Sequence, residues 1–212
     1  MTPPVKAICK LFEACRYRHD LYTVFSDCME AMAISLSNAT DLLHREAREA
    51  RYMQIVKRYE RDVIARFPQV LGELVMALEA GPSDVLGTVF HALELHNSAR
   101  GQFFTPYSLC QLMANMQMGD GRARSIIERE GFVTAHEPAC GAGAMVIAIA
   151  EALQQQGINY QQHLHVTAID IDPRAVHMAY VQFTLLHIPA EVIVGNTLTL
   201  QLKDTWHTAA HT

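Results

Sequence analysis

Short apolar runs alternate with longer segments of helical periodicity between residues 133 and 195, and this alternation constrains the fold most strongly. Residues 133–137, 164–170 and 191–195 have the length and apolar content of strands, while residues 144–155 and 173–187 repeat apolar side chains at helical spacing. Strands that alternate with helices form a parallel sheet with right-handed crossovers. The sequence therefore predicts an α/β fold around a short parallel sheet of about three strands.

Residues 1–100 are predicted to be helical almost throughout. Apolar side chains recur three or four positions apart between residues 42 and 64, with Arg, Lys and Glu between them. Pro68, the pair Gly81-Pro82 and Gly101 divide this stretch into four or five helices, and Ser83 is a suitable N-cap for a helix that runs to Leu95. We therefore predict a helical N-terminal region, residues 1–100, followed by a region that holds the sheet, residues 101–212.

The composition argues against several functional classes. The 212 residues carry a formal charge of -5, which disfavours binding to nucleic acid through net charge alone but allows a local basic face. No apolar run reaches the roughly 18 residues that cross a bilayer, and no secretory signal opens the chain, so we expect a soluble, cytoplasmic protein. The five cysteines are widely spaced without a CxxC pair, which favours reduced thiols and no metal site.

A glycine-containing turn follows the first predicted strand. Residues 137–143 read EPACGAG, and the glycines would let the backbone approach a ligand closely. The turn lacks the third glycine of the dinucleotide-binding GxGxxG pattern, and a plain tight turn would explain a GxG on its own. Its place between a strand and a helix, with a carboxylate after the next strand, favours a binding site.

That carboxylate is Asp170, 27 residues beyond Gly143 at the end of the second predicted strand. A carboxylate at this position can accept both ribose hydroxyls of a nucleoside. Asp172 is the alternative ribose ligand, but Pro173 follows it, and this order is typical of an N-cap residue at the start of a helix.

Four motifs in order resemble those of adenine-N6 DNA methyltransferases, in particular the modification subunits of type I restriction-modification systems. GQFFTP at residues 101–106 resembles the family's GQxxTP motif, EPACGAG its (D/E)PxCGxG motif, AIDID at 168–172 its second-strand acidic motif, and GNTL at 195–198 its GDxL motif. DVLG at 84–87 is similar to a family DxxG sequence that opens a helix. The resemblance implies a Rossmann-like class I methyltransferase core, S-adenosyl-L-methionine as cofactor and adenine in DNA as substrate.

The resemblance also implies which residues contact the cofactor: Phe104, Thr105, Pro106, Glu137, Pro138, Ala139, Cys140, Gly141, Gly143, Asp170, Ile171 and Asn196. Amides of the glycine turn and the Thr105 segment would face the cofactor's carboxylate, and Glu137 its amino group. Asp170 would hold the ribose, Ile171 would pack on one adenine face, and Asn196 would accept from the adenine amino group. The family usually has Asp at this last position, so weaker cofactor binding is expected.

The catalytic motif of the family, (N/D/S)PP(Y/F), is not found. Its polar residue accepts from the target adenine, and its aromatic ring stacks on the extruded base. The 16 residues after Asn196 contain no proline; Asp204-Thr205-Trp206-His207 offers a polar and an aromatic residue without the rigid proline turn. Trp206 is better explained as a packing anchor. The catalytic residues therefore remain unknown.

The same absence has a consequence for the sheet. The strand order of the family is 3-2-1-4-5, so a sheet without strand four would leave strand one at an unpaired edge, which invites aggregation. We expect the chain's own N-terminal helices to cover this edge. A second copy or a partner chain is the alternative, and it could also supply strand four and the catalytic tetrapeptide.

Basic residues are frequent between residues 45 and 66, with Glu and Asp interleaved. A solvated face with ion pairs along the helix is the simpler explanation, and a face that contacts phosphates is the alternative.

We therefore expect an adenine-N6 DNA methyltransferase of reduced form, completed by a partner or second copy. The alternative is a catalytically inactive module that binds cofactor or DNA, acting as a regulator on a mobile element. A small-molecule methyltransferase is disfavoured because GQFFTP is typical of the DNA-modifying branch.

Overall fold

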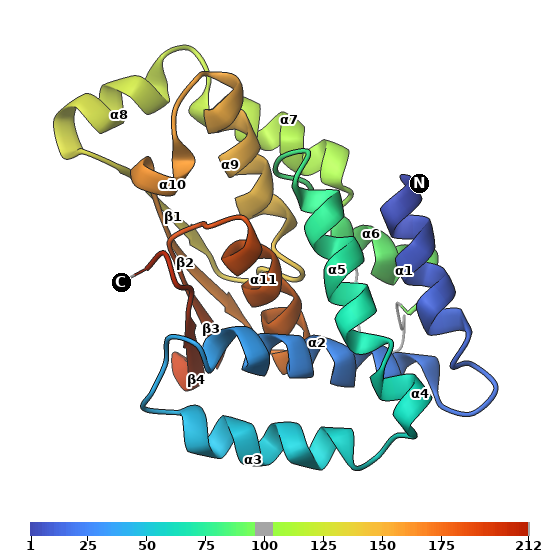
Figure 1. Cartoon of the computed structure of the whole chain (residues 1–212). Coiled ribbons are helices and arrows are strands. Elements are labelled where there is room, and N and C mark those ends of the chain that lie inside the picture. The colour runs from blue at the N-terminus through green and yellow to red at the C-terminus, as the bar shows by residue number, and fades with distance from the viewer. Residues whose placement is uncertain (96–103, 212) are drawn as a thin grey trace. The chain divides into compact units, whose positions relative to one another are not determined.

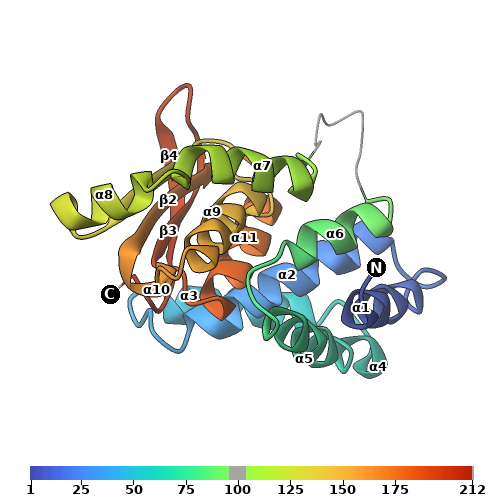
Figure 2. The same ribbon diagram turned by 90° about the horizontal axis from the view of Figure 1, so that it is seen from above.

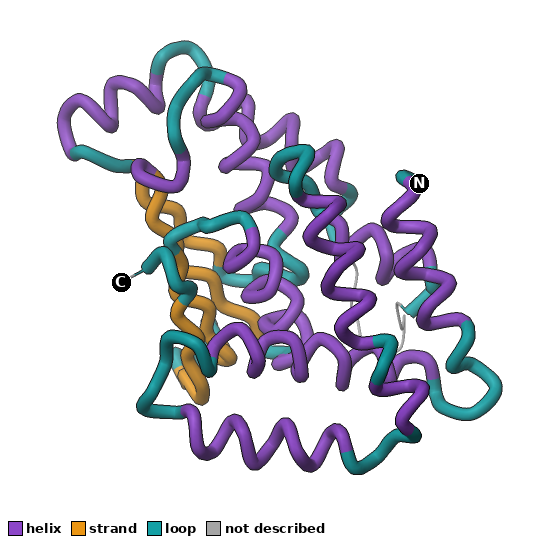
Figure 3. Tube along the Cα trace, viewed as in Figure 1, coloured by secondary structure: helices purple, strands orange, loops and turns teal. Residues whose placement is uncertain are grey.

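The computed structural model describes residues 1–95 and 104–211, and the chain forms two compact units (Figure 1). The first comprises residues 1–80 and 85–95, and the second comprises residues 81–84 and 104–211. Within the described residues the first unit is helical and the second holds the sheet (Figure 3). The predicted boundary between residues 100 and 101 lies outside the described residues.

The first unit contains six helices in its described part: α1 (Pro3–Glu13), α2 (Leu21–Ser37), α3 (Arg45–Val56), α4 (Arg61–Ile64), α5 (Phe67–Leu78) and α6 (Val85–Ala92). The sequence predicted four or five, and the additional one is the single turn α4. Phe12, Phe25 and Leu74 are fully buried in the core of this unit. Helix α6 begins at Val85, so Asp84 directly precedes it instead of the predicted cap Ser83.

The second unit alternates helices and strands: α7 (Tyr107–Met118), α8 (Arg122–Glu130), β1 (Val133–Glu137), α9 (Ala144–Gln155), α10 (Tyr160–His163), β2 (Leu164–Asp170), α11 (Pro173–Leu185), β3 (Ala190–Asn196) and β4 (Gln201–His207). The three strands and the two connecting helices predicted between residues 133 and 195 are all present. The α/β fold with a helical N-terminal region is therefore confirmed.

The sheet has the order β1-β2-β3-β4. Strands β1, β2 and β3 are parallel, and β4 runs antiparallel to β3, with an irregularity between Val194 and Gly195. The sequence did not predict β4. Of its seven residues only Trp206 is buried, so the strand lacks the apolar pattern by which the others are recognised.

Helices α9 and α11 lie on the same side of the sheet (Figure 1), and α7 runs along α9 (Figure 2). Tyr180 and Phe183 of α11 and Ile147 of α9 are fully buried between these layers. Asp172 caps α11 as predicted, because its carboxylate accepts the N–H of Arg174 at 3.0 Å.

Strand β1 forms one edge of this sheet. In the part of the chain that the structure describes, β1 pairs with β2 and with no second strand. Helices α8 and α9 of the same unit contact it, and the Thr134 and His136 side chains are exposed. Strand one is thus the edge strand, as predicted. Its coverage by the N-terminal helices stays a prediction.

Candidate cofactor site

The turn after β1 and the end of β2 are joined directly. The N–H of Gly141 donates to Oδ2 of Asp170 at 2.8 Å, and the N–H of Cys140 donates to the carbonyl of Ile169 at 2.9 Å. Gly141 has a φ of 54°, in the left-handed region that favours glycine. The two places that the sequence predicted to converge on one nucleoside-sized ligand therefore lie side by side.

Asp170 is a partly buried carboxylate whose second oxygen, Oδ1, accepts the N–H of Asp172 at 2.9 Å. Burial raises the pKa of the Asp170 carboxyl, and the Asp172 charge adds to this, against the lowering effect of the backbone N–H donors. Each carboxylate oxygen has two lone pairs, so each can accept one hydroxyl besides its backbone donor. Asp170 can therefore accept hydrogen bonds from both hydroxyls of a diol.

The two glycines of the turn have different reasons to be glycine. A Cβ on Gly141 would lie 2.9 Å from Cδ1 of Phe104, so the Phe104 ring packs on the turn. A Cβ on Gly143, where φ is 94°, would lie 2.5 Å from Cε1 of Phe183 in α11. Gly143 is thus required for close packing of two helices, while Gly141 shapes the turn beside Asp170.

The preceding and following loops are tied to the same turn. Glu137 accepts the N–H of Ala139 at 3.2 Å, and the Thr197 hydroxyl after β3 donates to the carbonyl of Pro138 at 2.7 Å. Thr105 and Pro106, immediately before α7, are exposed. Residues 101–103 of the GQFFTP motif lie outside the described residues.

The adenine end of the predicted site is lined by Ile171 and Asn196. Ile171 is 65% exposed, an unusual setting for a large apolar side chain beside a carboxylate. Oδ1 of Asn196 accepts the N–H groups of Leu198 at 3.0 Å and Thr199 at 3.2 Å. Because both of its lone pairs are used within the loop, the oxygen expected to accept from adenine is already satisfied, and the Nδ2 group is a donor.

The sequence profile of the N-6 DNA methylase family matches residues 83–211, more than half of the chain. The chain belongs to the N-6 DNA methylase family. It is also similar to the crystal structure of a class I S-adenosylmethionine-dependent methyltransferase from Listeria monocytogenes, with a TM-score of 0.50 and 14% identity. That match covers 95% of this chain and 56% of the other, and at this identity it shows the fold alone. No curated protein matched the chain.

N-6 DNA methylases use S-adenosylmethionine, and the residues of this chain fit that group. Asp170 has lone pairs for a ribose, and Ile171 offers an exposed apolar surface for a base. Cys140 is buried in the turn, and burial raises the pKa of its thiol well above the ordinary value, with the Asp170 and Glu137 charges adding to the rise. A protonated buried thiol is a packing group here, not a nucleophile.

The structure also shows what surrounds Trp206. Trp206 is 3% exposed, and its ring lies 5.1 Å from that of His177 and 5.3 Å from that of Tyr180, measured between centroids. The prediction of a packing anchor is confirmed. A ring held in this way has no free face for an extruded base, so residues 204–207 do not replace the catalytic tetrapeptide.

Most arginines between residues 45 and 66 form ion pairs. Arg48 pairs with Asp41, Arg51 with Glu30 at 2.6 Å and Arg58 with Asp27 at 3.0 Å. These pairs support the ion-paired face over a face reserved for phosphates.

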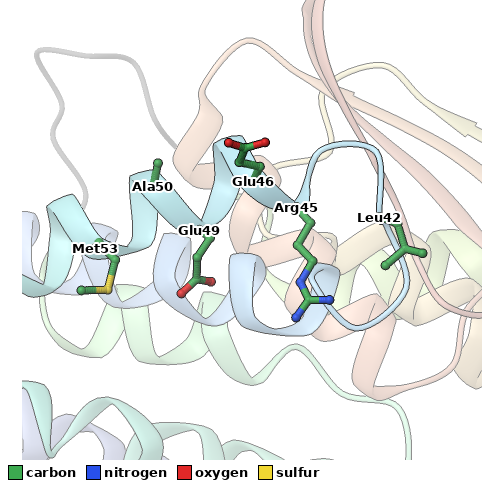
Figure 4. Close-up of a pocket in the computed structure, with 6 residues that line it drawn as sticks. All are labelled: Leu42, Arg45, Glu46, Glu49, Ala50 and Met53. Atoms are coloured by element: carbon green, nitrogen blue, oxygen red, sulfur yellow. The ribbon is translucent and has the colours of Figure 1, made fainter.

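A shallow hollow of about 420 Å³ lies along helix α3 and the residues before it in the first unit. Its lining contains no residue of the four motifs. It is lined by Leu42, Arg45, Glu46, Glu49, Ala50 and Met53 (Figure 4).

Two residues near the turn escaped the sequence-based prediction of the site. Gln182 of α11 is fully buried and donates to the carbonyl of Ala142, and Asp84 accepts from the same amide. The sequence offered two signals: the DVLG similarity at residues 84–87 and a glutamine between apolar residues of a helix. In the described residues no group of three or more His, Cys, Asp or Glu side chains is arranged to hold a metal ion. No helix among them is long and apolar enough to cross a membrane.

Proposed function

We propose that this chain binds S-adenosylmethionine at the carboxyl ends of β1, β2 and β3 and serves adenine-N6 methylation of DNA. The observation that carries the proposal is the hydrogen bond from the Gly141 N–H to Asp170, which brings the glycine turn and the acidic strand end to one place. Membership in the N-6 DNA methylase family supports the cofactor and the class of substrate.

Each residue has a role in the proposal that its surroundings allow. Asp170 accepts the ribose hydroxyls, and the exposed Ile171 packs on the adenine. Asn196 donates from Nδ2 to a ring nitrogen of the adenine, because its oxygen is occupied by the backbone. Glu137 binds the amino group of the methionine part, and exposed Thr105 binds its carboxylate.

The bound cofactor supplies an electrophilic methyl group on a sulfonium. When bound, it would be held by Asp170, Ile171 and Asn196, and its methyl group would be the one available to the amino group of a target adenine in DNA. The chain contributes positioning. Ile171, Asp170 and the glycine turn would hold the cofactor in one orientation, and this removes much of the entropic cost of bringing its methyl group and the target base together.

We further propose that a second copy of this chain completes the sheet along β1. Strand β1 has an unpaired edge in the described residues, and helix α7 of the same unit contains no charged residue. Four large apolar side chains of α7 are 42 to 72% exposed at helical spacing: Leu109, Leu112, Met113 and Met116. A two-fold axis perpendicular to the sheet would pair the two β1 edges and bring the two stripes together.

The binding test is a calorimetric titration with S-adenosylmethionine. We expect a single site per chain. Asp170→Ala should lose at least about tenfold in affinity, because a hydrogen-bonded carboxylate contributes roughly 1.5–3 kcal/mol. Asp204→Ala, a carboxylate on the outer strand β4, is the control and should bind as the unmodified protein does. An Asp170→Ala protein with full affinity would reject the ribose assignment.

A second function, cofactor or DNA binding without catalysis as a regulatory module, is favoured by one observation: the Trp206 ring is buried. Transfer of radiolabelled methyl to adenine-containing DNA decides between the two. Transfer by the chain, alone or with a candidate partner from its genetic neighbourhood, supports the enzyme. Tight cofactor binding with no transfer under any of these conditions supports the regulatory module.

A further inference from the structure

A buried polar connection links three segments of the second unit. The side-chain amide nitrogen of Gln182, in α11, donates to Oδ1 of Asp84 at 3.0 Å and to the carbonyl oxygen of Ala142 at 2.8 Å. Gln182 is 0% and Asp84 is 6% exposed. The two hydrogens of one amide nitrogen are thus both used, one on a carboxylate and one on the backbone of the glycine turn.

The Asp84 charge also acts on the first turn of α7. Burial raises the pKa of Tyr107, and the hydrogen bond to Glu151 and the charges of Glu151 and Asp84 raise it further. Burial likewise raises the pKa of the Cys110 thiol, with Asp84 the largest charge contribution. Asp84 is therefore close to residues that directly follow Thr105 and Pro106. A negative charge near the start of a helix is favourable.

We propose that Asp84 and Gln182 are positioning residues that hold the glycine turn in its cofactor-binding conformation, and that DVLG at residues 84–87 serves this purpose. The inference rests on the proposed cofactor function. Ala142 lies between Gly141, whose N–H donates to Asp170, and Gly143, which packs on Phe183. Fixing its carbonyl fixes the peptide plane between Ala142 and Gly143, so the turn keeps the conformation in which the Gly141 N–H donates to Asp170. The Asp84 carboxylate accepts one N–H of the Gln182 amide and so fixes its orientation, which directs the second N–H to the Ala142 carbonyl.

The decisive variant is Gln182→Met, which keeps the length of the side chain and removes both donors. We expect the affinity for S-adenosylmethionine to fall roughly tenfold or more, because a buried carbonyl and a carboxylate lose a donor and the turn relaxes. In the cofactor-free protein, amide hydrogen exchange of Gly141 and Gly143 should accelerate by about tenfold.

Tyr160→Phe is the matched control. The Tyr160 hydroxyl donates to the carbonyl of Leu186 at 3.0 Å in a buried setting, and neither residue belongs to the turn. Its loss should lower the unfolding temperature to a similar degree as Gln182→Met, while cofactor affinity and exchange at the turn stay within about twofold of the unmodified protein. A purely structural role of Gln182 would make the two variants behave alike.

Asp84 is tested by a pair of substitutions. Asp84→Ala removes the acceptor and should weaken cofactor binding, whereas Asp84→Asn keeps a carbonyl oxygen for Gln182 and should restore most of the affinity. Should Gln182→Met fail to fold, this pair still decides the question. The inference is overturned if Gln182→Met or Asp84→Ala leaves both the affinity and the turn exchange unchanged. If the unmodified protein does not bind the cofactor, the proposed function fails, and the exchange rates still test the positioning role.

Discussion

Replacing Asn196 by Asp would change the hydrogen-bonding groups that the site presents to the adenine of the cofactor. Asn196 uses its oxygen on two backbone N–H groups, at 3.0 and 3.2 Å, and leaves a donor for the ligand. In Asn196→Asp one carboxylate oxygen can keep those bonds while the other accepts from the adenine amino group. We expect S-adenosylmethionine to bind about tenfold more tightly, since a charged acceptor strengthens a hydrogen bond by roughly 1–2 kcal/mol. Calorimetry measures the difference.

Asn196→Ala is the companion variant for this prediction. It removes both the donor and the loop acceptor and should bind more weakly than the unmodified protein. Equal affinities for Asn, Asp and Ala at this position would show that residue 196 does not face the adenine.

The protonation of Asp170 should set the pH dependence of cofactor binding. Burial raises the pKa of this carboxyl above its ordinary 3.8. A protonated carboxyl accepts fewer hydrogen bonds, so affinity should fall as the pH is lowered from neutral toward the raised pKa of Asp170. Asp170→Ala should lose this dependence, and a binding constant of the unmodified protein that does not change over this range contradicts the assignment.

Folding stability should respond to the same group with the opposite sign. A raised pKa means that the folded chain binds this proton more tightly than the unfolded chain does. The contribution of Asp170 to stability is thus fully present below its unfolded pKa and is lost as the pH rises through the folded value. The cofactor-bound protein should lose less stability over this range than the free protein.

At the scale of elements, the start of α9 depends on its close approach to α11. Gly143→Ala places a Cβ 2.5 Å from the Phe183 ring at a φ of 94°. Backbone strain of about 1–2 kcal/mol and overpacking of about 1–3 kcal/mol should add in the free energy of unfolding. Gly157→Ala is the matched control, because Gly157 has a φ of 71° with no neighbouring atom within 4 Å. Denaturant unfolding should show a clearly larger loss in the free energy of unfolding for Gly143→Ala than for Gly157→Ala. Equal losses would mean that α11 shifts to admit the new Cβ without an energetic penalty.

The elements also show what a sequence can and cannot predict. Strands β2 and β3 and the helices α9 and α11 were predictable because their burial imposes an apolar pattern, and Asp172 because an N-cap is a local feature. Strand β4 is an exposed edge, and its pairing with β3 is a tertiary property without a local pattern. The role of Gln182 was hidden for the same reason, since its acceptors Asp84 and Ala142 are 98 and 40 positions away along the chain.

For the whole molecule, the proposed pairing of two copies along β1 predicts a dimer. Met116 on α7 is 72% exposed within the uncharged stripe, so Met116→Glu would place a charge in the proposed interface at small cost to the single chain. Light scattering should give about twice the 23.7 kDa chain mass for the unmodified protein and the single mass for this variant. Met76→Glu, at an exposed methionine of α5 in the first unit, should leave the mass unchanged.

This pair of variants separates self-association from binding of a different partner. A two-fold dimer contains each contact twice. The Met116→Glu glutamate of each copy would therefore face the apolar side chains of α7 in the other copy. The loss should therefore be steep, with the dissociation constant rising by about a hundredfold for two buried charges. A monomer at every concentration of the unmodified protein would exclude the second copy as the occupant. The edge would then be left to a strand of a different chain.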